Sequence, residues 1–165
     1  MAQVFPGRYT THAPGEATAV FLIGLRINTF RGLRKAPAVV SAMPRMLKFL
    51  SENPDSGLLG FQNWLSRTTV VVSYWRTAAD VQRFASDPSA PHADAWRAFN
   101  QKVGSGRDLG VWHELYTIRP GDFEGVYVNM PRFGMAGVSE HLPVGDGMRT
   151  SKQRMAAGIP AIDRT

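Results

Sequence analysis

The sequence predicts an α+β fold of the ferredoxin-like type, in which helices cover one face of an antiparallel sheet. Two observations support this prediction. Apolar runs typical of strands alternate with segments of helical periodicity in the order βαββαβ. Two of the strand-like runs also follow each other across a short polar turn, which favours a hairpin in the middle of the chain. A length of 165 residues fits one domain.

The first strand is predicted over 19–28, where the sequence reads AVFLIGLRIN. Alternate side chains of a strand point to opposite faces, so one face carries only aliphatic and aromatic residues. The other face begins with Leu22 and ends with Arg26 and Asn28. A face that becomes polar at one end either lines a pocket there or emerges into solvent, and the sequence leaves both interpretations open.

The next elements are a helix and two strands. Helical periodicity predicts a helix over 37–50, which Pro44 should kink or restart. Residues 53–57 read NPDSG, a composition typical of a turn. Strands are then predicted over 58–65 and 69–75, and their short connection makes them a hairpin.

The second helical region follows the hairpin. Thr77, with Asp80 three residues later, resembles a helix-capping pair and predicts a short helix that breaks before Pro88. Another helical segment begins near Pro91. Side chains at helical spacing give this segment one face toward the sheet: His92, Ala95, Trp96, Phe99 and Val103. The last strand of the unit is predicted over 109–118.

We expect the chain to have three parts: an N-terminal arm at 1–17, a ferredoxin-like α/β-barrel domain at 18–130 and an irregular C-terminal tail at 131–165. Residues 125–129 could add a strand or a clasp. Helices cover one face of such a sheet, yet several strands are apolar on both faces. We therefore expect a homodimer, with the tail wrapping the neighbouring subunit or closing over a pocket.

The composition excludes several kinds of site and partner. The chain has no cysteine, which excludes disulfides, thiolate metal sites and a cysteine nucleophile. The net charge is +6, but the basic residues are scattered and no nucleic-acid-binding motif accompanies them. No apolar run approaches the roughly 20 residues that span a bilayer, and the first residues lack a signal-peptide pattern. We expect neither a nucleic-acid nor a membrane partner, and a cytoplasmic location.

Two histidines are candidates for chemistry. His92 faces inward by periodicity, and its place in the first turn of a helix favours the neutral imidazole that a metal ligand or general base needs. His113 shares one side of its strand with two aliphatic residues, where an ionisable ring is costly to bury without a partner. Either ring could instead be a hydrogen-bonded structural histidine. Glu114 points to the opposite side, so it cannot form an acid–base pair with His113.

Familiar catalytic signatures are missing: a Walker-type phosphate loop, G-x-G-x-x-G, H-E-x-x-H and G-x-S-x-G. The histidines and carboxylates do not have the spacing of a zinc site, so no metal is expected. Aromatic residues occur in several elements close to the two histidines, which fits an apolar cavity between sheet and helices. The candidate substrate-binding residues are Trp64, Trp75, Trp96, Phe99 and Tyr116.

Three runs resemble one family: SYWRTAADVQRFASDPSAPHADAWRAFN, GVWHELYTI and FEGVYVNMPRFG. They are similar to proteins named after a monooxygenase of the fumagillin biosynthetic pathway, over about 18–140. That family belongs to the dimeric α/β-barrel superfamily, with the antibiotic-biosynthesis and haem-degrading monooxygenases. The resemblance implies ferredoxin-like protomers that pair sheet to sheet, with one pocket per subunit between sheet and helices.

The resemblance also implies two kinds of chemistry. Antibiotic-biosynthesis members oxidise electron-rich substrates without metal or flavin. Haem-degrading members place a helix histidine under the iron, with an asparagine on the first strand and a tryptophan on the third. Asn28, Trp75 and His92 occupy loosely similar positions in this chain.

Three functions therefore remain open. The first is a monooxygenase acting on an apolar or aromatic small molecule, with secondary metabolism as one setting. In this function His92 or His113 deprotonates the substrate, and Arg26 or Asn28 stabilises the anion. The second is a haem enzyme with His92, or alternatively His113, as the iron ligand. The third is a dimer that binds a small ligand without catalysis. The cofactor is accordingly none or haem.

Overall fold

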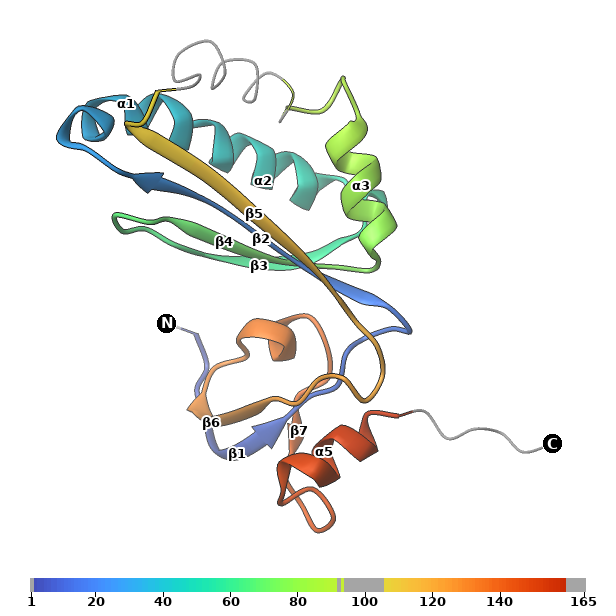
Figure 1. Ribbon diagram of the computed structural model, residues 1–165. Coiled ribbons are helices and arrows are strands. Elements are labelled where there is room, and N and C mark those ends of the chain that lie inside the picture. The colour runs from blue at the N-terminus through green and yellow to red at the C-terminus, as the bar shows by residue number, and fades with distance from the viewer. Residues whose placement is uncertain (1, 92, 94–105, 160–165) are drawn as a thin grey trace.

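We describe residues 2–91, 93 and 106–159 of a computed structural model of the protein (Figure 1). His92, Trp96 and Phe99 lie outside the described residues. The elements, in chain order, are β1 (Phe5–Thr10), β2 (Thr18–Ile27), α1 (Phe30–Val40), α2 (Ala42–Glu52), the 3-10 turn η1 (Pro54–Ser56), β3 (Leu58–Trp64), β4 (Val70–Trp75), α3 (Ala78–Ser86), β5 (Leu109–Ile118), β6 (Val126–Met130), the 3-10 turn η2 (Gly134–Gly137), β7 (Leu142–Pro143) and α5 (Ser151–Ala157).

The main sheet has four antiparallel strands in the order β3-β4-β2-β5. This is the strand order of the ferredoxin-like fold, because the first and third strands of the βαββαβ unit lie side by side in the centre. The predicted fold class is therefore confirmed, as is the hairpin of β3 and β4. The predicted strands agree with β2, β3, β4 and β5 to within one residue at each end.

Helices α1, α2 and α3 lie on one face of the main sheet, which we call the helix side (Figure 1). Near the α3 end, Trp75 and Ala19 pack with Leu50 of α2 and Val81 of α3. Near the α1 end, a second cluster joins β2 and β5 to α1: Leu25, Leu109 and Ala36. The helix side thus has two packed ends, one under each helical region.

A second sheet, in the order β6-β1-β7, lies below the main sheet in Figure 1. It combines strands from the expected arm and from the expected tail, and α5 follows it. The part of the chain around η2 packs on the opposite face of the main sheet, where the rings of Trp64 and Phe133 meet edge-on at 6.0 Å. Residues 125–129 were expected to add a strand or a clasp; they form the strand β6, which pairs with β1.

The helix predicted over 37–50 is in fact two helices that meet at Ser41. Helix α1 begins earlier than predicted, at Phe30, because the hydroxyl of Thr29 accepts a hydrogen bond from the Gly32 amide at 3.2 Å and caps it. Pro44 lies in the first turn of α2, where its missing N–H costs no helical hydrogen bond. A new helix, α2, therefore begins just before Pro44, and Pro44 does not kink a continuous helix.

The predicted cap of α3 is confirmed. The Thr77 hydroxyl accepts from the Asp80 amide at 3.1 Å, and the Asp80 carboxylate accepts from the Thr77 hydroxyl and the Arg83 guanidinium, both at 2.8 Å. Burial alone would raise the pKa of Asp80, but these hydrogen bonds and the charge of Arg83 outweigh it and lower the pKa below its usual value.

We predict that Asp80→Asn lowers the free energy of unfolding at pH 7 by about 1–3 kcal/mol, because it removes a buried charge-assisted network. The folded-state pKa of Asp80 is depressed, so its contribution is present above its unfolded-state pKa and is lost as the pH falls through the folded-state value. Urea unfolding at several pH values should therefore show a difference from wild type that disappears in acid.

The control is Asp146→Asn, because Asp146 is almost fully exposed and pairs only with Arg149 in the part of the chain described. Its effect should stay within about 0.5 kcal/mol at every pH. Equal effects of the two substitutions at neutral pH would contradict the role given to Asp80.

Candidate active site

The central strand pair β2 and β5 carries the strongest candidate for chemistry, His113. The two strands pair over ten residues without a register shift, and His113 lies directly opposite Ile23. Val111, two residues earlier on β5, packs with the α1 cluster on the helix side. Because side chains alternate along a strand, His113 points to the helix side as well.

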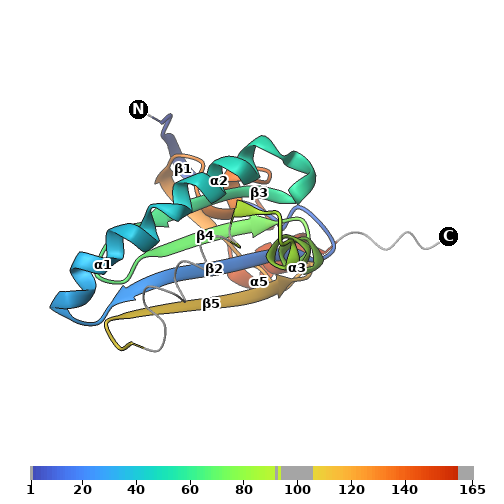
Figure 2. The same ribbon diagram turned by 90° about the horizontal axis from the view of Figure 1, so that it is seen from above.

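His113 lies between the two packed ends of the helix side. Figure 2 shows α2 running over the β3 and β4 part of the sheet and α3 over one end of β2, while α1 packs against the other end of β2 and the start of β5. Within the described residues, no helix covers the middle of β2 and β5, and His113 is exposed. Its ring lies 5.7 Å from that of Phe21, and its other neighbours on the helix side of β2 and β5 are aliphatic: Ile23, Val111 and Leu115. We call His113 and these four residues the His113 strip.

The opposite face of β5 carries a different polar pair. The Tyr116 hydroxyl donates to the Glu114 carboxylate at 2.6 Å, and this hydrogen bond raises the pKa of Tyr116. Glu114 therefore points away from His113, as the strand alternation predicts. Tyr116, a candidate substrate-binding residue, is exposed on the face that the helices do not cover.

Arg26 and Asn28 do not lie beside His113. Arg26 is three positions along β2 from Ile23, which corresponds to about 10 Å, and belongs to the opposite face. Its guanidinium donates to the Thr68 hydroxyl at 2.8 Å. The Asn28 amide donates to the carbonyl of Arg107 at 3.2 Å, so it ties the end of β2 to the segment before β5.

The described aromatic candidates do not share one cavity. Trp75 is on the helix side, but only 2% of it is exposed, and its indole N–H donates to the Ser73 hydroxyl at 2.9 Å. It packs beside Phe84 in the core under α3, with ring centres 5.9 Å apart. Trp64 is on the opposite face, against Phe133. Trp75 is thus part of the buried core next to Phe21 on the helix side, whereas Trp64 and Tyr116 lie on the opposite face of the sheet.

The sequence placed Val111 and Leu115 beside His113 on the same strand, but it did not single out the side chains that β2 adds. Phe21 and Ile23 become neighbours of His113 only through the register of β2 against β5. The alternation of each strand was visible in the sequence. The pairing of Ile23 with His113 was not, because it depends on how the two strands align.

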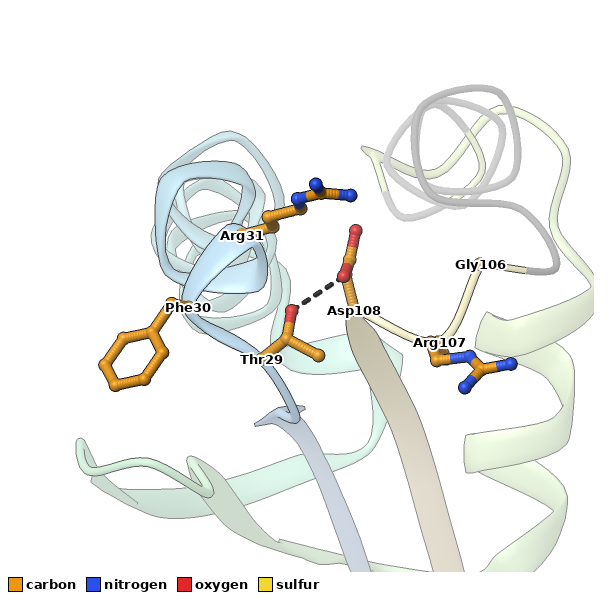
Figure 3. Close-up of a pocket in the computed structure, with 6 residues that line it drawn as sticks. All are labelled: Thr29, Phe30, Arg31, Gly106, Arg107 and Asp108. Carbon is orange, nitrogen blue, oxygen red and sulfur yellow. Dashed lines mark hydrogen bonds between the residues drawn. The ribbon is translucent and has the colours of Figure 1, made fainter.

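A surface hollow of about 700 Å³ lies elsewhere, at the start of α1 and β5 (Figure 3). It is lined by Thr29, Phe30, Arg31, Gly106, Arg107 and Asp108. The Asp108 carboxylate accepts from Lys35 at 2.7 Å and from the Thr29 hydroxyl at 2.6 Å, and these bonds lower the pKa of Asp108. Asp108 therefore joins α1 to β5. We place the candidate site not in this hollow but at His113, five positions further along the chain.

A polar and aromatic cluster between the two sheets was not expected from the sequence. The ring of His141 stacks on Tyr9 at 4.2 Å, and its pKa is lowered by burial and by the nearby charge of Arg132. Burial also raises the pKa values of Tyr74 and Tyr127. This cluster packs the second sheet against the first and has no neighbour in the His113 strip among the contacts described.

We predict that Glu114→Gln returns the pKa of Tyr116 toward its ordinary value, because the substitution removes the carboxylate that favours the protonated phenol. The measurement is the pH titration of the Tyr116 ring signal by NMR, assigned with Tyr116→Phe. An unchanged pKa in the variant would mean that Glu114 does not act on Tyr116. Tyr74, whose raised pKa comes from burial, serves as the internal control and should not change.

Two solved structures are among those to which the chain is similar. The crystal structure of an aldoxime dehydratase in complex with butyraldoxime matches with a TM-score of 0.65 and 14% identity, over 84% of this chain and 43% of that chain. The chain thus spans less than half of that enzyme, and the likeness shows the fold alone. SnoaB, a cofactor-independent oxygenase from Streptomyces nogalater, matches with a TM-score of 0.43 and 19% identity, over 62% of this chain and 94% of that chain.

The remaining comparisons concern the sequence itself. No curated protein matches the chain. The family described as monooxygenase af470-like matches residues 18–135, which is most of the chain. The chain therefore belongs to the monooxygenase af470-like family.

Proposed function

We propose that the protein oxygenates an apolar, electron-rich aromatic small molecule, and that His113 is the base that deprotonates it. The observation that carries the proposal is the position of His113, an exposed imidazole among apolar side chains on the helix side of the central strand pair. Membership of a monooxygenase family supports the reaction type. His92 remains the second candidate base.

The proposed reaction needs no external reductant. A base removes a proton from a phenol or an activated C–H group, and the resulting anion can donate an electron to dioxygen. Overall, one CH₂ group and one O₂ give one C=O group and one water, so that the substrate supplies all four electrons. The protein's part is to hold the ring, to accept the proton at His113 and to keep water from the anion.

Each part of the His113 strip has a role in this proposal. Phe21 and Leu115 hold the aromatic ring by apolar contact, and Ile23 forms the floor directly beside His113. Arg26 and Asn28 lie about 10 Å or more along β2 from the residue opposite His113, so they take no part in the proton transfer. A polar partner for the anion would have to come from another segment of the protein or from the distant end of the substrate itself.

A homodimer remains part of the proposal. Exposed apolar side chains also occur away from the helix side: Tyr116 on β5 of the main sheet, and Val126 and Val128 on β6 of the second sheet. Apolar surface of this kind commonly marks an interface between subunits. The boundaries of the domain at 18 and 130 and the cytoplasmic location also remain proposals. In the described part of the chain, no helix is long and apolar enough to cross a bilayer.

The direct test is oxygen consumption with a panel of hydroquinones, naphthols and anthrones. We predict that His113→Gln lowers kcat for the best substrate by about 100-fold or more, the contribution usual for a general base. The matched control is Glu114→Gln, the next residue on the same strand, which faces the other way and should stay within about threefold of wild type. Wild-type turnover in His113→Gln, combined with loss in His92→Gln, would move the base to His92 and overturn our assignment.

A haem-dependent reaction is the second candidate, because a single imidazole among apolar side chains also suits an iron ligand. His113 would hold the iron, and the haem would supply the activation of dioxygen. Titration with haemin, followed by absorption, separates the two candidates without an activity assay. The haem candidate requires a Soret band that saturates at one haem per chain and is lost in His113→Gln or His92→Gln. Its absence leaves the cofactor-independent reaction.

A further inference from the structure

Three segments that are far apart in the sequence meet at one end of the protein. Residues 26–35, 64–68 and 106–108 are joined by hydrogen bonds: Arg26 donates to the Thr68 hydroxyl at 2.8 Å, and Arg67 donates to the Ile27 carbonyl at 3.1 Å. Asn28 donates to the Arg107 carbonyl at 3.2 Å. Figure 1 shows the start of α1, the β3–β4 turn and the start of β5 gathered at this end, which we call the basic end.

The basic end carries most of the net charge of the chain. Its three segments contain six cations, Arg26, Arg31, Arg34, Lys35, Arg67 and Arg107, and one anion, Asp108. Their net charge is +5, out of +6 for the whole chain, which leaves +1 for all other residues. Charge gathered in this way produces a strong positive potential on one side of the protein within a Debye length of about 8–10 Å.

Three large apolar side chains project from the same end. Phe30 is 93% exposed, Leu65 76% and Leu33 58%. Phe30 and Leu33 are one turn apart on the outer side of α1, while Ala36 is buried against β2 and β5. Figure 3 shows the Phe30 ring pointing away from Asp108 and from the body of the protein. Exposed side chains of this size next to arginines are the pattern of a surface that inserts into the interface of a membrane.

We propose that the basic end docks on a membrane surface that contains anionic phospholipids. The arginines contact the headgroup phosphates, and Phe30, Leu33 and Leu65 enter the boundary between headgroups and acyl chains. This contact does not span the bilayer, and it does not depend on the reaction at His113. No membrane partner was expected from the sequence, because no apolar run is long enough to span a bilayer. The cations are scattered along the chain, and only folding brings them together.

Charge and shape argue against two other occupants. A second copy related by a twofold axis would place a net charge of +5 against a net charge of +5. A nucleic acid would be attracted by the charge, but two of the three projecting side chains are aliphatic, and leucine offers no ring on which a base could stack. An anionic lipid surface matches both the charge and the aliphatic tips.

The test is co-sedimentation of the full-length protein with sucrose-loaded vesicles, of phosphatidylcholine alone or with about 30% phosphatidylserine. We expect binding to the anionic vesicles only, with at least a tenfold loss of affinity in the double variant Phe30→Ser, Leu65→Ser. We expect a similar loss in Arg31→Glu, Arg34→Glu, and weakening of wild-type binding as salt is raised.

Two matched controls remove equivalent side chains elsewhere: Val4→Ser with Ile159→Ser for exposed apolar residues, and Arg149→Glu with Lys152→Glu for basic ones. Both should bind like wild type, and circular dichroism checks that each variant is folded. The proposal is overturned if wild type binds neither kind of vesicle, or if the Phe30, Leu65 double variant binds the anionic vesicles as tightly as wild type. It is overturned as well if single-stranded RNA displaces the protein from vesicles while the Phe30, Leu65 variant keeps full RNA affinity. It is also overturned if light scattering shows that this variant converts a dimer to a monomer.

Discussion

The pairing of β2 with β5 determines where every candidate side chain lies. Ten consecutive residue pairs hold the two strands in one register, and β4 fixes the other edge of β2. A shift by one residue would move His113 to the face that now carries Tyr116, because side chains alternate along a strand. The site proposed at His113 therefore depends on the same hydrogen bonds that build the sheet.

Contacts hold the helices at both ends of this strand pair, and the proposed site lies at the middle of the pair. At one end, Asp108 accepts from Thr29 and Lys35, and a side chain at Gly32 would collide with the Asp108 carbonyl, so α1 lies close against β5. At the other end, Asp80 holds the first turn of α3 beside the turn after α2. The hydrogen bonds at these two junctions use no residue of the His113 strip. Phe21 and Val111 of the strip nevertheless also pack against the core clusters under the helices.

The strands and their order could be predicted because apolar alternation and turn residues are local signals. The same alternation placed His113 and Glu114 on opposite sides of the sheet, but it did not say which side the helices cover. The start of α1 was missed because its first turns carry basic, exposed residues and a cap that bonds to Gly32, features that resemble a loop in sequence. Which tryptophan is core and which is surface could not be predicted: Trp75 and Trp64 have similar strand contexts, and only packing under α3 or against Phe133 separates them. The pairing of β1 with β6 joins residues more than a hundred positions apart and has no local signal.

The most direct test of the central claim is NMR of the protein with isotope-labelled histidine rings, titrated with an electron-rich hydroquinone under anaerobic conditions. Signals are assigned by single His→Gln variants, and anaerobic conditions keep the ligand unreacted. The account predicts saturable shifts of the His113 signals, with His12 and His141 unchanged because they lie in and around the second sheet. Saturable shifts of His12 or His141 while His113 remains unchanged would place the binding site elsewhere and contradict the account.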